Sequence, residues 1–118
     1  MSNPELIRTV YTILQPDGTP TNGVVMWPEN PGYERIRELT NTILGVDTFP
    51  ERVVYRKADG GVADMLVDED GHNVGQQYNT QATAHYRRDW MLKNPGQNPD
   101  FMHHIVGIAI VFDRKVWY

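Results

Sequence analysis

The stretch IVGIAIVF, from Ile105 to Phe112, is the longest apolar run of the chain. A strand with one wet face alternates apolar and polar side chains, but this run is apolar at both alternating sets of positions. It therefore predicts a strand in the middle of a sheet, covered on both faces. The run is interrupted by Gly107 and is much too short to span a bilayer as a helix, so we expect no membrane segment here.

Turn-forming residues on either side of short apolar stretches predict that the rest of the sheet is built from hairpins. Each turn supplies a residue that tolerates positive φ. The turns are Pro16-Asp17-Gly18, Asn22-Gly23, Asp59-Gly60-Gly61 and Asp70-Gly71. The flanking stretches are rich in β-branched and aromatic residues, which favours strands at Thr9–Leu14, Gly23–Trp27, Arg52–Arg56 and Val62–Val67. A third arm could begin after Asp70-Gly71, and an edge strand could follow at Lys115–Tyr118.

Two segments have helical spacing. The first contains Tyr33, Ile36, Leu39, Ile43 and Leu44 and closes at Gly45, a C-cap candidate, so it predicts an amphipathic helix lying on the sheet. The second would begin at the N-cap Asn79 and run to about Leu92, with Ala82, Tyr86 and Trp90 at four-residue steps on one face. We therefore predict an α+β fold: a single compact domain over residues 1–118, with a mostly antiparallel, hairpin-built sheet and two helices packed on it.

Composition narrows the class of protein. At 118 residues and 40% hydrophobic content, the chain is large enough to bury a core. It has no cysteine and no apolar leader at its start, so we expect a cytoplasmic protein. The net charge of −4 argues against strong binding to a nucleic-acid backbone. Five acids between Asp59 and Asp70, with no Lys or Arg among them, are expected on a solvated hairpin face.

No familiar catalytic or cofactor motif is present. The sequence has no P-loop, no dinucleotide-binding glycine pattern and no nucleophile elbow, and Ser2 is its only serine. The histidines are His72, His85, His103 and His104, and none has metalloprotease spacing. The adjacent side chains of His103 and His104 would point to opposite faces of a strand. We therefore expect no metal site, no cofactor and no catalytic residue.

The densest cluster of side chains suited to binding lies in the second helix. Arginine pairs bind phosphate or carboxylate groups, and aromatic rings stack on bases, so this helix could face a small anionic ligand such as a nucleotide. Alternatively, the aromatic rings pack on the sheet while the arginines lie in solvent or pair with the acidic hairpin. The candidate ligand-binding residues are Asn79, Gln81, His85, Tyr86, Arg87, Arg88 and Trp90.

The order of these elements resembles a family of small proteins of unknown function carried by phages, plasmids and bacterial genomes. The matching pieces are the opening strand pair, the helix through Leu44-Gly45, the Asp68-Glu69-Asp70-Gly71 turn, the segment Tyr78–Thr83 and the closing strand Ile105–Val111. The segment from His85 to His104 is longer than in that family. The resemblance implies a fold and a mobile-element context, and it makes Asn79 a position to test as a cap or as a ligand contact.

Three functions stay open at this point. The first is a non-enzymatic binding protein of a phage or mobile element, which binds a host protein or sequesters a small anionic ligand. The second is a small enzyme in which His85, Asp89 and His103 supply acid–base chemistry. The third is a homo-oligomeric structural or assembly protein joined through an edge strand near Trp117.

Overall fold

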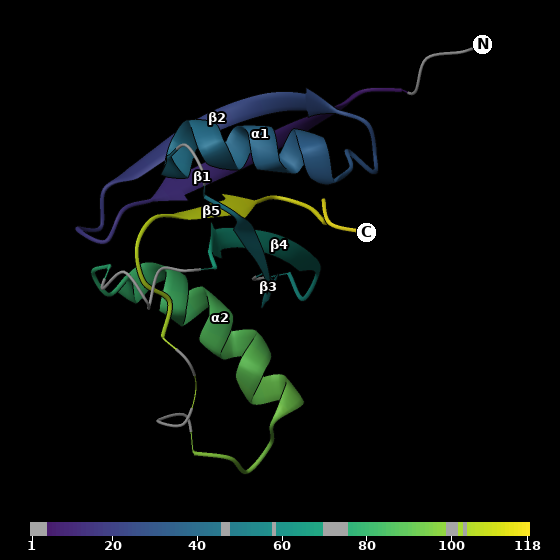
Figure 1. The fold of residues 1–118 in the computed structure, drawn as a ribbon. Helices are drawn as coiled ribbons and strands as arrows, with labels where there is room; N and C mark the ends of the chain where they lie inside the picture. The colour runs from purple at the N-terminus through teal and green to yellow at the C-terminus, as the bar shows by residue number, and fades with distance from the viewer. Residues whose placement is uncertain (1–4, 46–47, 58, 70–75, 99–101, 103) are drawn as a thin grey trace.

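The chain forms a five-stranded antiparallel sheet with one helix against each face (Figure 1). The structure is a computed structural model, and it describes residues 5–45, 48–57, 59–69, 76–98, 102 and 104–118. The predicted α+β class, with a hairpin-built sheet and two helices in one domain, is confirmed. The elements are β1 (Ile7–Leu14), β2 (Pro20–Trp27), α1 (Tyr33–Leu44), β3 (Pro50–Arg56), β4 (Val62–Asp68), α2 (Thr80–Lys93) and β5 (Ala109–Phe112).

The last strand, β5, lies in the middle of the sheet, as the apolar run predicts. The strand order is β2-β1-β5-β4-β3, and all neighbours are antiparallel. Ala109 belongs to the core beneath α2, whereas Ile110 and Phe112 belong to the core beneath α1, and all three are fully buried. The strand is shorter than the run, because Gly107 has a φ of 73° and takes the backbone out of the extended region.

The first hairpin forms as predicted, except that Asn22-Gly23 is not a turn. The chain reverses once, at Gly18, whose φ is 91°, and the Asp17 carboxylate there accepts a hydrogen bond of 2.8 Å from the N–H of Thr19. β2 then runs through Gly23, which pairs with Tyr11 of β1. A Cβ at position 23 would collide with the Tyr11 ring. The glycine is therefore required by a neighbouring strand and not by a turn.

The second hairpin, β3–β4, is confirmed around Asp59-Gly60-Gly61. Gly60 has a φ of 89°, and Asp59 Oδ1 accepts a hydrogen bond of 2.8 Å from the N–H of Gly61. The Asp70-Gly71 turn and the third arm expected after it lie outside the described residues.

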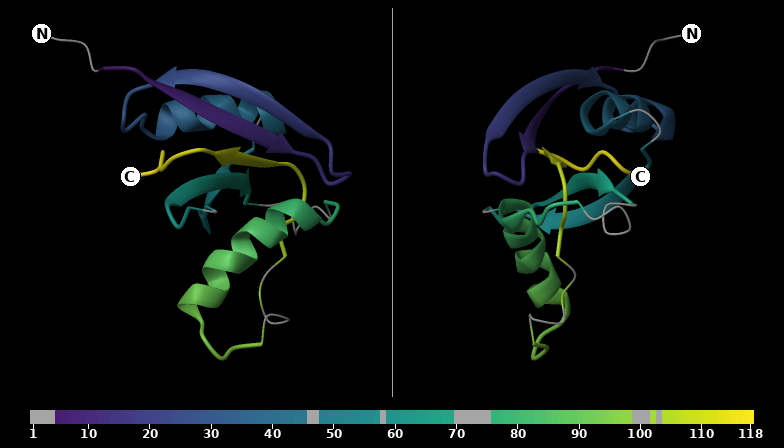
Figure 2. Two further views of the ribbon diagram at one scale, coloured as in Figure 1. Left: turned by 180° about the vertical axis from the view of Figure 1, so that it is seen from behind. Right: turned by 60° about the vertical axis from the view of Figure 1, so that its left-hand side comes forward.

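Both predicted helices are present, and each carries one of the two cores. α1 ends at Gly45 and packs Ile36, Leu39 and Ile43 on one face of the sheet. α2 begins after Asn79 and packs Ala82 and Tyr86 on the opposite face. α2 lies against the β3 side of the sheet and extends away from it (Figures 1 and 2). Among the described residues, no helix is both long and apolar enough to cross a bilayer.

The segment after β5 is not the edge strand that the sequence suggested, and Asp64 is not part of a solvated acidic face. Asp64 is fully buried in β4. Its Oδ2 accepts hydrogen bonds from the backbone N–H groups of Val116 and Trp117, at 2.9 and 2.8 Å, and its Oδ1 accepts one of 2.8 Å from Arg52 Nε. These donors satisfy the hydrogen-bonding capacity of the buried carboxylate. The segment after β5 is therefore held by the Asp64 side chain and not by a ladder of backbone pairing with a neighbouring strand.

Candidate functional site

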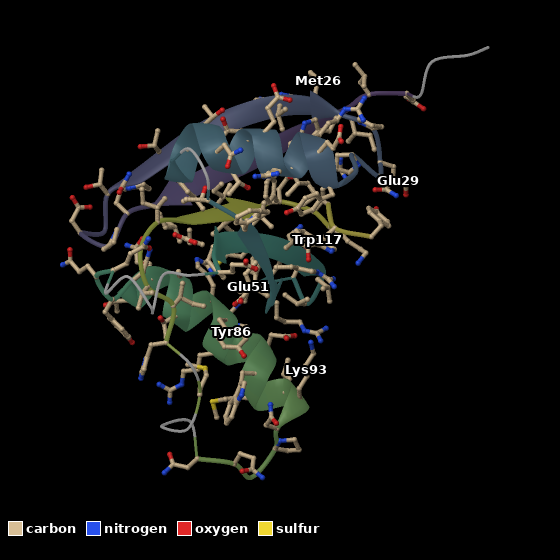
Figure 3. The ribbon with its side chains drawn as sticks, in the orientation of Figure 1. Met26, Glu29, Glu51, Tyr86, Lys93 and Trp117 are labelled. Carbon is tan, nitrogen blue, oxygen red and sulfur yellow. The ribbon has the colours of Figure 1, made fainter. Side chains whose placement is uncertain are left out.

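A cleft of about 640 Å³ opens between α2 and the β3–β4 end of the sheet. Four segments line it: β3, the end of β4 with Glu69, the later part of α2 with its C-cap, and the residues that lead into β5. Figure 3 shows Glu51 of β3 on the side of the sheet that faces α2, where Tyr86 and Lys93 lie. The lining residues are Glu51, Arg52, Val53, Val54, Val67, Asp68, Glu69, Tyr86, Asp89, Trp90, Lys93, Asn94, His104, Ile105 and Val106.

The apolar part of the cleft is continuous with the core beneath α2. Val53, Val67 and Ile105 belong to that core and are buried. Tyr86 and Trp90, one helical turn apart, are each partly exposed and so present ring surface to the cleft. An apolar floor with aromatic walls suits a ligand that has a flat or apolar body.

The charged residues of the lining are predominantly acidic. Four carboxylates, from Glu51, Asp68, Glu69 and Asp89, face two permanent cations, from Arg52 and Lys93. Both cations already have partners: Arg52 Nε lies 2.8 Å from Asp64, and Lys93 Nζ lies 2.8 Å from Asp89. Glu51 and Glu69 are exposed and belong to none of the ion pairs found among the described residues. The charged groups of the cleft that a ligand could pair with are therefore mainly carboxylates.

Asp89 anchors the charged wall of the cleft. It is only 2% exposed, and its two oxygens lie 2.8 Å from Lys93 Nζ and 3.4 Å from an amino nitrogen of Arg56. A buried carboxylate requires such partners, because its desolvation costs several kcal/mol when it is unpaired. Asp89 thereby ties α2 to the edge strand β3 at the mouth of the cleft.

The Tyr86 hydroxyl stays protonated in this setting. Burial raises the pKa of Tyr86 above its ordinary value, and the nearby carboxylates of Asp89 and Glu51 raise it further, against an opposing effect of Lys93. The phenol is thus a neutral hydrogen-bond donor at any physiological pH, next to two acceptor carboxylates.

Sequence and structure agree on only part of the predicted site. Tyr86 and Trp90 line the cleft. Arg87 and Arg88 are exposed and lie outside the lining, as in the alternative in which the rings pack inward and the arginines lie in solvent. Gln81 is also outside, with Nε2 3.5 Å from the carbonyl oxygen of Gly18.

Asn79 is fully buried, and its amide is committed to the fold. Its Oδ1 accepts a hydrogen bond from the N–H of Ala82 at 3.1 Å, which is the predicted N-cap. Its Nδ2 donates to the carbonyl oxygens of Leu14 and Gly107, at 3.0 and 2.8 Å. One side chain thus joins the start of α2 to the end of β1 and to the approach to β5.

His85 lies beside the core and does not line the cleft. Its ring meets the Tyr55 ring edge to face, with centroids 5.6 Å apart. Partial burial lowers the pKa of His85, and the positive charge of Arg88 lowers it further, so both effects favour the neutral imidazole. His103, the third residue of the acid–base alternative, lies outside the described residues, as does His72.

Sequence reasoning missed Glu51, Asp89 and Lys93 as cleft residues. Asp89 and Lys93 lie three and seven residues after Tyr86, so helical spacing alone could have placed them on the Tyr86 face. Nothing in the local sequence distinguishes Glu51 from other strand carboxylates. Among the described residues, no three histidine, aspartate or glutamate side chains gather closely enough to hold a metal ion.

No known protein identifies the site. The chain matches no protein-family model, and neither a curated protein nor a solved structure shows significant similarity to it. The resemblance to a mobile-element family, with the context it implies, stays a prediction. The chemistry of the cleft is the basis on which a function can be inferred.

Proposed function

We propose that this chain is a non-enzymatic binding protein and that the cleft beneath α2 is its ligand site. The observation that carries the proposal is an opening of about 640 Å³ with an apolar floor, two aromatic rings and several carboxylates. Small-molecule sites are commonly clefts of roughly 300–1,000 Å³, mostly apolar, with a few polar groups that fix orientation. The cleft has this size and this composition.

The charge of the lining favours a ligand that carries a positive nitrogen. Glu51 and Glu69 are exposed carboxylates outside any ion pair among the described residues. A protonated amine in the cleft would form an ion pair with them. The faces of Tyr86 and Trp90 attract cations as well as flat apolar groups. We therefore infer an organic cation with a flat apolar body, such as an aromatic amine.

The Coulomb energy between the ligand charge and a cleft carboxylate should separate the affinities of cationic and anionic ligands. A unit charge about 5 Å from a carboxylate contributes roughly 1 kcal/mol in bulk water and about 3 kcal/mol at the effective dielectric of a protein surface. This contribution is favourable for a cation and unfavourable by the same amount for an anion. Two ligands that share one apolar body and differ only in charge should therefore differ in affinity by tenfold or more.

The exposed side of α2 supports a second candidate, the binding of an anionic or protein partner there. Arg87, Arg88, Met91 and Leu92 recur at helical spacing and are all exposed, Leu92 at 62%. Neither arginine belongs to an ion pair among the described residues. A host protein with an acidic and apolar surface would suit this stripe, and a mobile-element context would suit such a partner.

One titration tests both candidates. The protein is labelled with ¹⁵N and titrated with tryptamine and, separately, with indole-3-acetate, which share an indole ring and carry opposite charges. We expect tryptamine to shift the Trp90 indole N–H resonance and the Glu51 amide. Larger cleft shifts with the anion, or none with either probe, would contradict the proposal. Anion-induced shifts confined to Arg87 and Arg88 would favour the second candidate.

A further inference from the structure

The two edges of the sheet differ in how well they are protected against pairing with another strand. An edge strand presents unpaired N–H and C=O groups, and charged side chains on that strand discourage another strand from pairing there. The β3 edge carries Glu51, Arg52 and Arg56, and α2 packs beside it. The β2 edge carries no charged residue from Pro20 to Trp27. Apart from Pro20 at its start, β2 has none of these guards and is the less protected edge.

The apolar surface next to β2 is also uncovered. Val24 and Met26 point to the face of the sheet that carries α2, but α2 packs on the β3 side and leaves them 48% and 52% exposed. Figure 3 shows Met26 on β2, at the opposite end of the view from α2. Two half-exposed apolar side chains thus adjoin an open backbone ladder.

We propose that β2 is the pairing edge of a two-fold symmetric dimer, in which the sheets of two copies of this chain join antiparallel. In an antiparallel pair of strands across a two-fold axis, the residue on the axis faces its own copy, and every other residue faces the one equally far beyond the axis. Because β2 has no charged residue, no register of such a pair sets like charges opposite each other. Each copy has a net charge of −4 and repels the other overall, and the neutral β2 edge avoids adding to that repulsion. A second copy can therefore pair along this edge without charge repulsion between the two strands.

The size of the contact sets the strength of the dimer. An eight-residue strand is about 27 Å long, and with a sheet thickness of roughly 10 Å it covers on the order of 300 Å² per copy. Stable interfaces cover about 800 Å² per partner. The dimer should therefore be reversible, forming at high protein concentration and dissociating on dilution.

Light scattering coupled to size exclusion, over a concentration series up to millimolar, tests the proposal. We expect the wild-type mass to rise from one chain toward two. A variant with Val24→Lys and Met26→Lys should stay at one chain with an unchanged circular dichroism spectrum. The matched control carries Val62→Lys and Leu92→Lys, which add the same charge at exposed apolar sites away from β2, and should still dimerise.

Hydrogen exchange gives a second readout at the level of the backbone. Amides of residues 20–27 should exchange more slowly at high than at low concentration, and amides of β3 should not change. A wild-type protein that stays monomeric throughout would overturn the proposal. So would a dimer that survives in the Val24→Lys and Met26→Lys variant, or one lost equally in the control.

Discussion

Oδ2 of Asp64, in the middle of β4, accepts a hydrogen bond of 2.9 Å from the backbone N–H of Val116, 52 residues further along the chain. The same oxygen accepts a second bond from the N–H of Trp117 at 2.8 Å. Val116 is fully buried against the α1 core, and Trp117 packs edge to face on Tyr33. The carboxylate therefore fixes the last residues of the chain over the sheet.

Replacement of Asp64 should be among the most destabilising changes in the chain. Asp64→Ala leaves two backbone donors and the Arg52 guanidinium without their acceptor, and we expect it to lower the free energy of unfolding by about 3 kcal/mol. Asp64→Asn keeps one oxygen acceptor and should cost less. Urea unfolding measures both, with Glu38→Gln on the exposed face of α1 as a control within about 0.5 kcal/mol of wild type. An Asp64→Ala protein as stable as that control would refute the assignment.

Asn79 should behave as a structural residue. Asn79→Ala removes the cap of α2 and leaves the carbonyl oxygens of Leu14 and Gly107 without their donor, so we expect a loss of about 3 kcal/mol. Asn79→Asp keeps the capping oxygen but sets a negative charge against those carbonyls, and should also destabilise. Thermal unfolding would report both. The comparison variant is Gln81→Ala, an exposed change expected to have little effect.

Tyr55 should make the fold sensitive to alkali. Its hydroxyl donates to the carbonyl oxygen of Phe112, and burial, with smaller contributions from Asp113 and Asp64, raises the pKa of Tyr55 to about 12. The unfolded phenol ionises near pH 10. Below that pH the group adds no pH dependence, and between about pH 10 and 12 the unfolded state releases a proton that the folded state keeps. Stability should therefore fall over this range, by up to about 3 kcal/mol when complete.

Denaturant unfolding at neutral pH and at a pH of about 11 tests this dependence. In Tyr55→Phe the alkaline loss should shrink, although the variant starts less stable by about 1 kcal/mol because the Phe112 carbonyl loses a hydrogen bond. Tyr118→Phe, at an exposed ring, should keep the full loss. Identical pH profiles for Tyr55→Phe and wild type would show that the phenol is not the group responsible.

Local signals in the sequence were sufficient for most of the fold. The Asp59-Gly60-Gly61 turn, the Gly45 cap and the apolar positions of both helices depend on neighbours within a few residues. Asn22-Gly23 has the composition of a turn, but Gly23 is there because the Tyr11 ring crosses it from β1. Aspartate is a residue type usually found on the surface. Asp64 is buried because backbone groups far away in the sequence donate hydrogen bonds to it.

The candidate site was predictable in part, for the same reason. Helical spacing brings Tyr86, Trp90 and Lys93 to one side of α2 and turns Arg87 and Arg88 away, but the sequence does not say which side meets the sheet. Glu51 and Ile105 reach the cleft from segments far apart in the chain. Their convergence depends on the packing of α2 against β3, which no local pattern encodes.

The dissociation constant of tryptamine for Glu51→Gln, measured beside wild type and Glu38→Gln, tests the central claim most directly. Glu51→Gln preserves the shape of the side chain and removes one exposed charge from the cleft, whereas Glu38→Gln removes a charge from α1, outside the cleft. We expect Glu51→Gln to bind about fivefold more weakly, equivalent to ~1 kcal/mol for a solvent-facing pair, and Glu38→Gln to match wild type. Equal constants for all three proteins would contradict a cation site in the cleft.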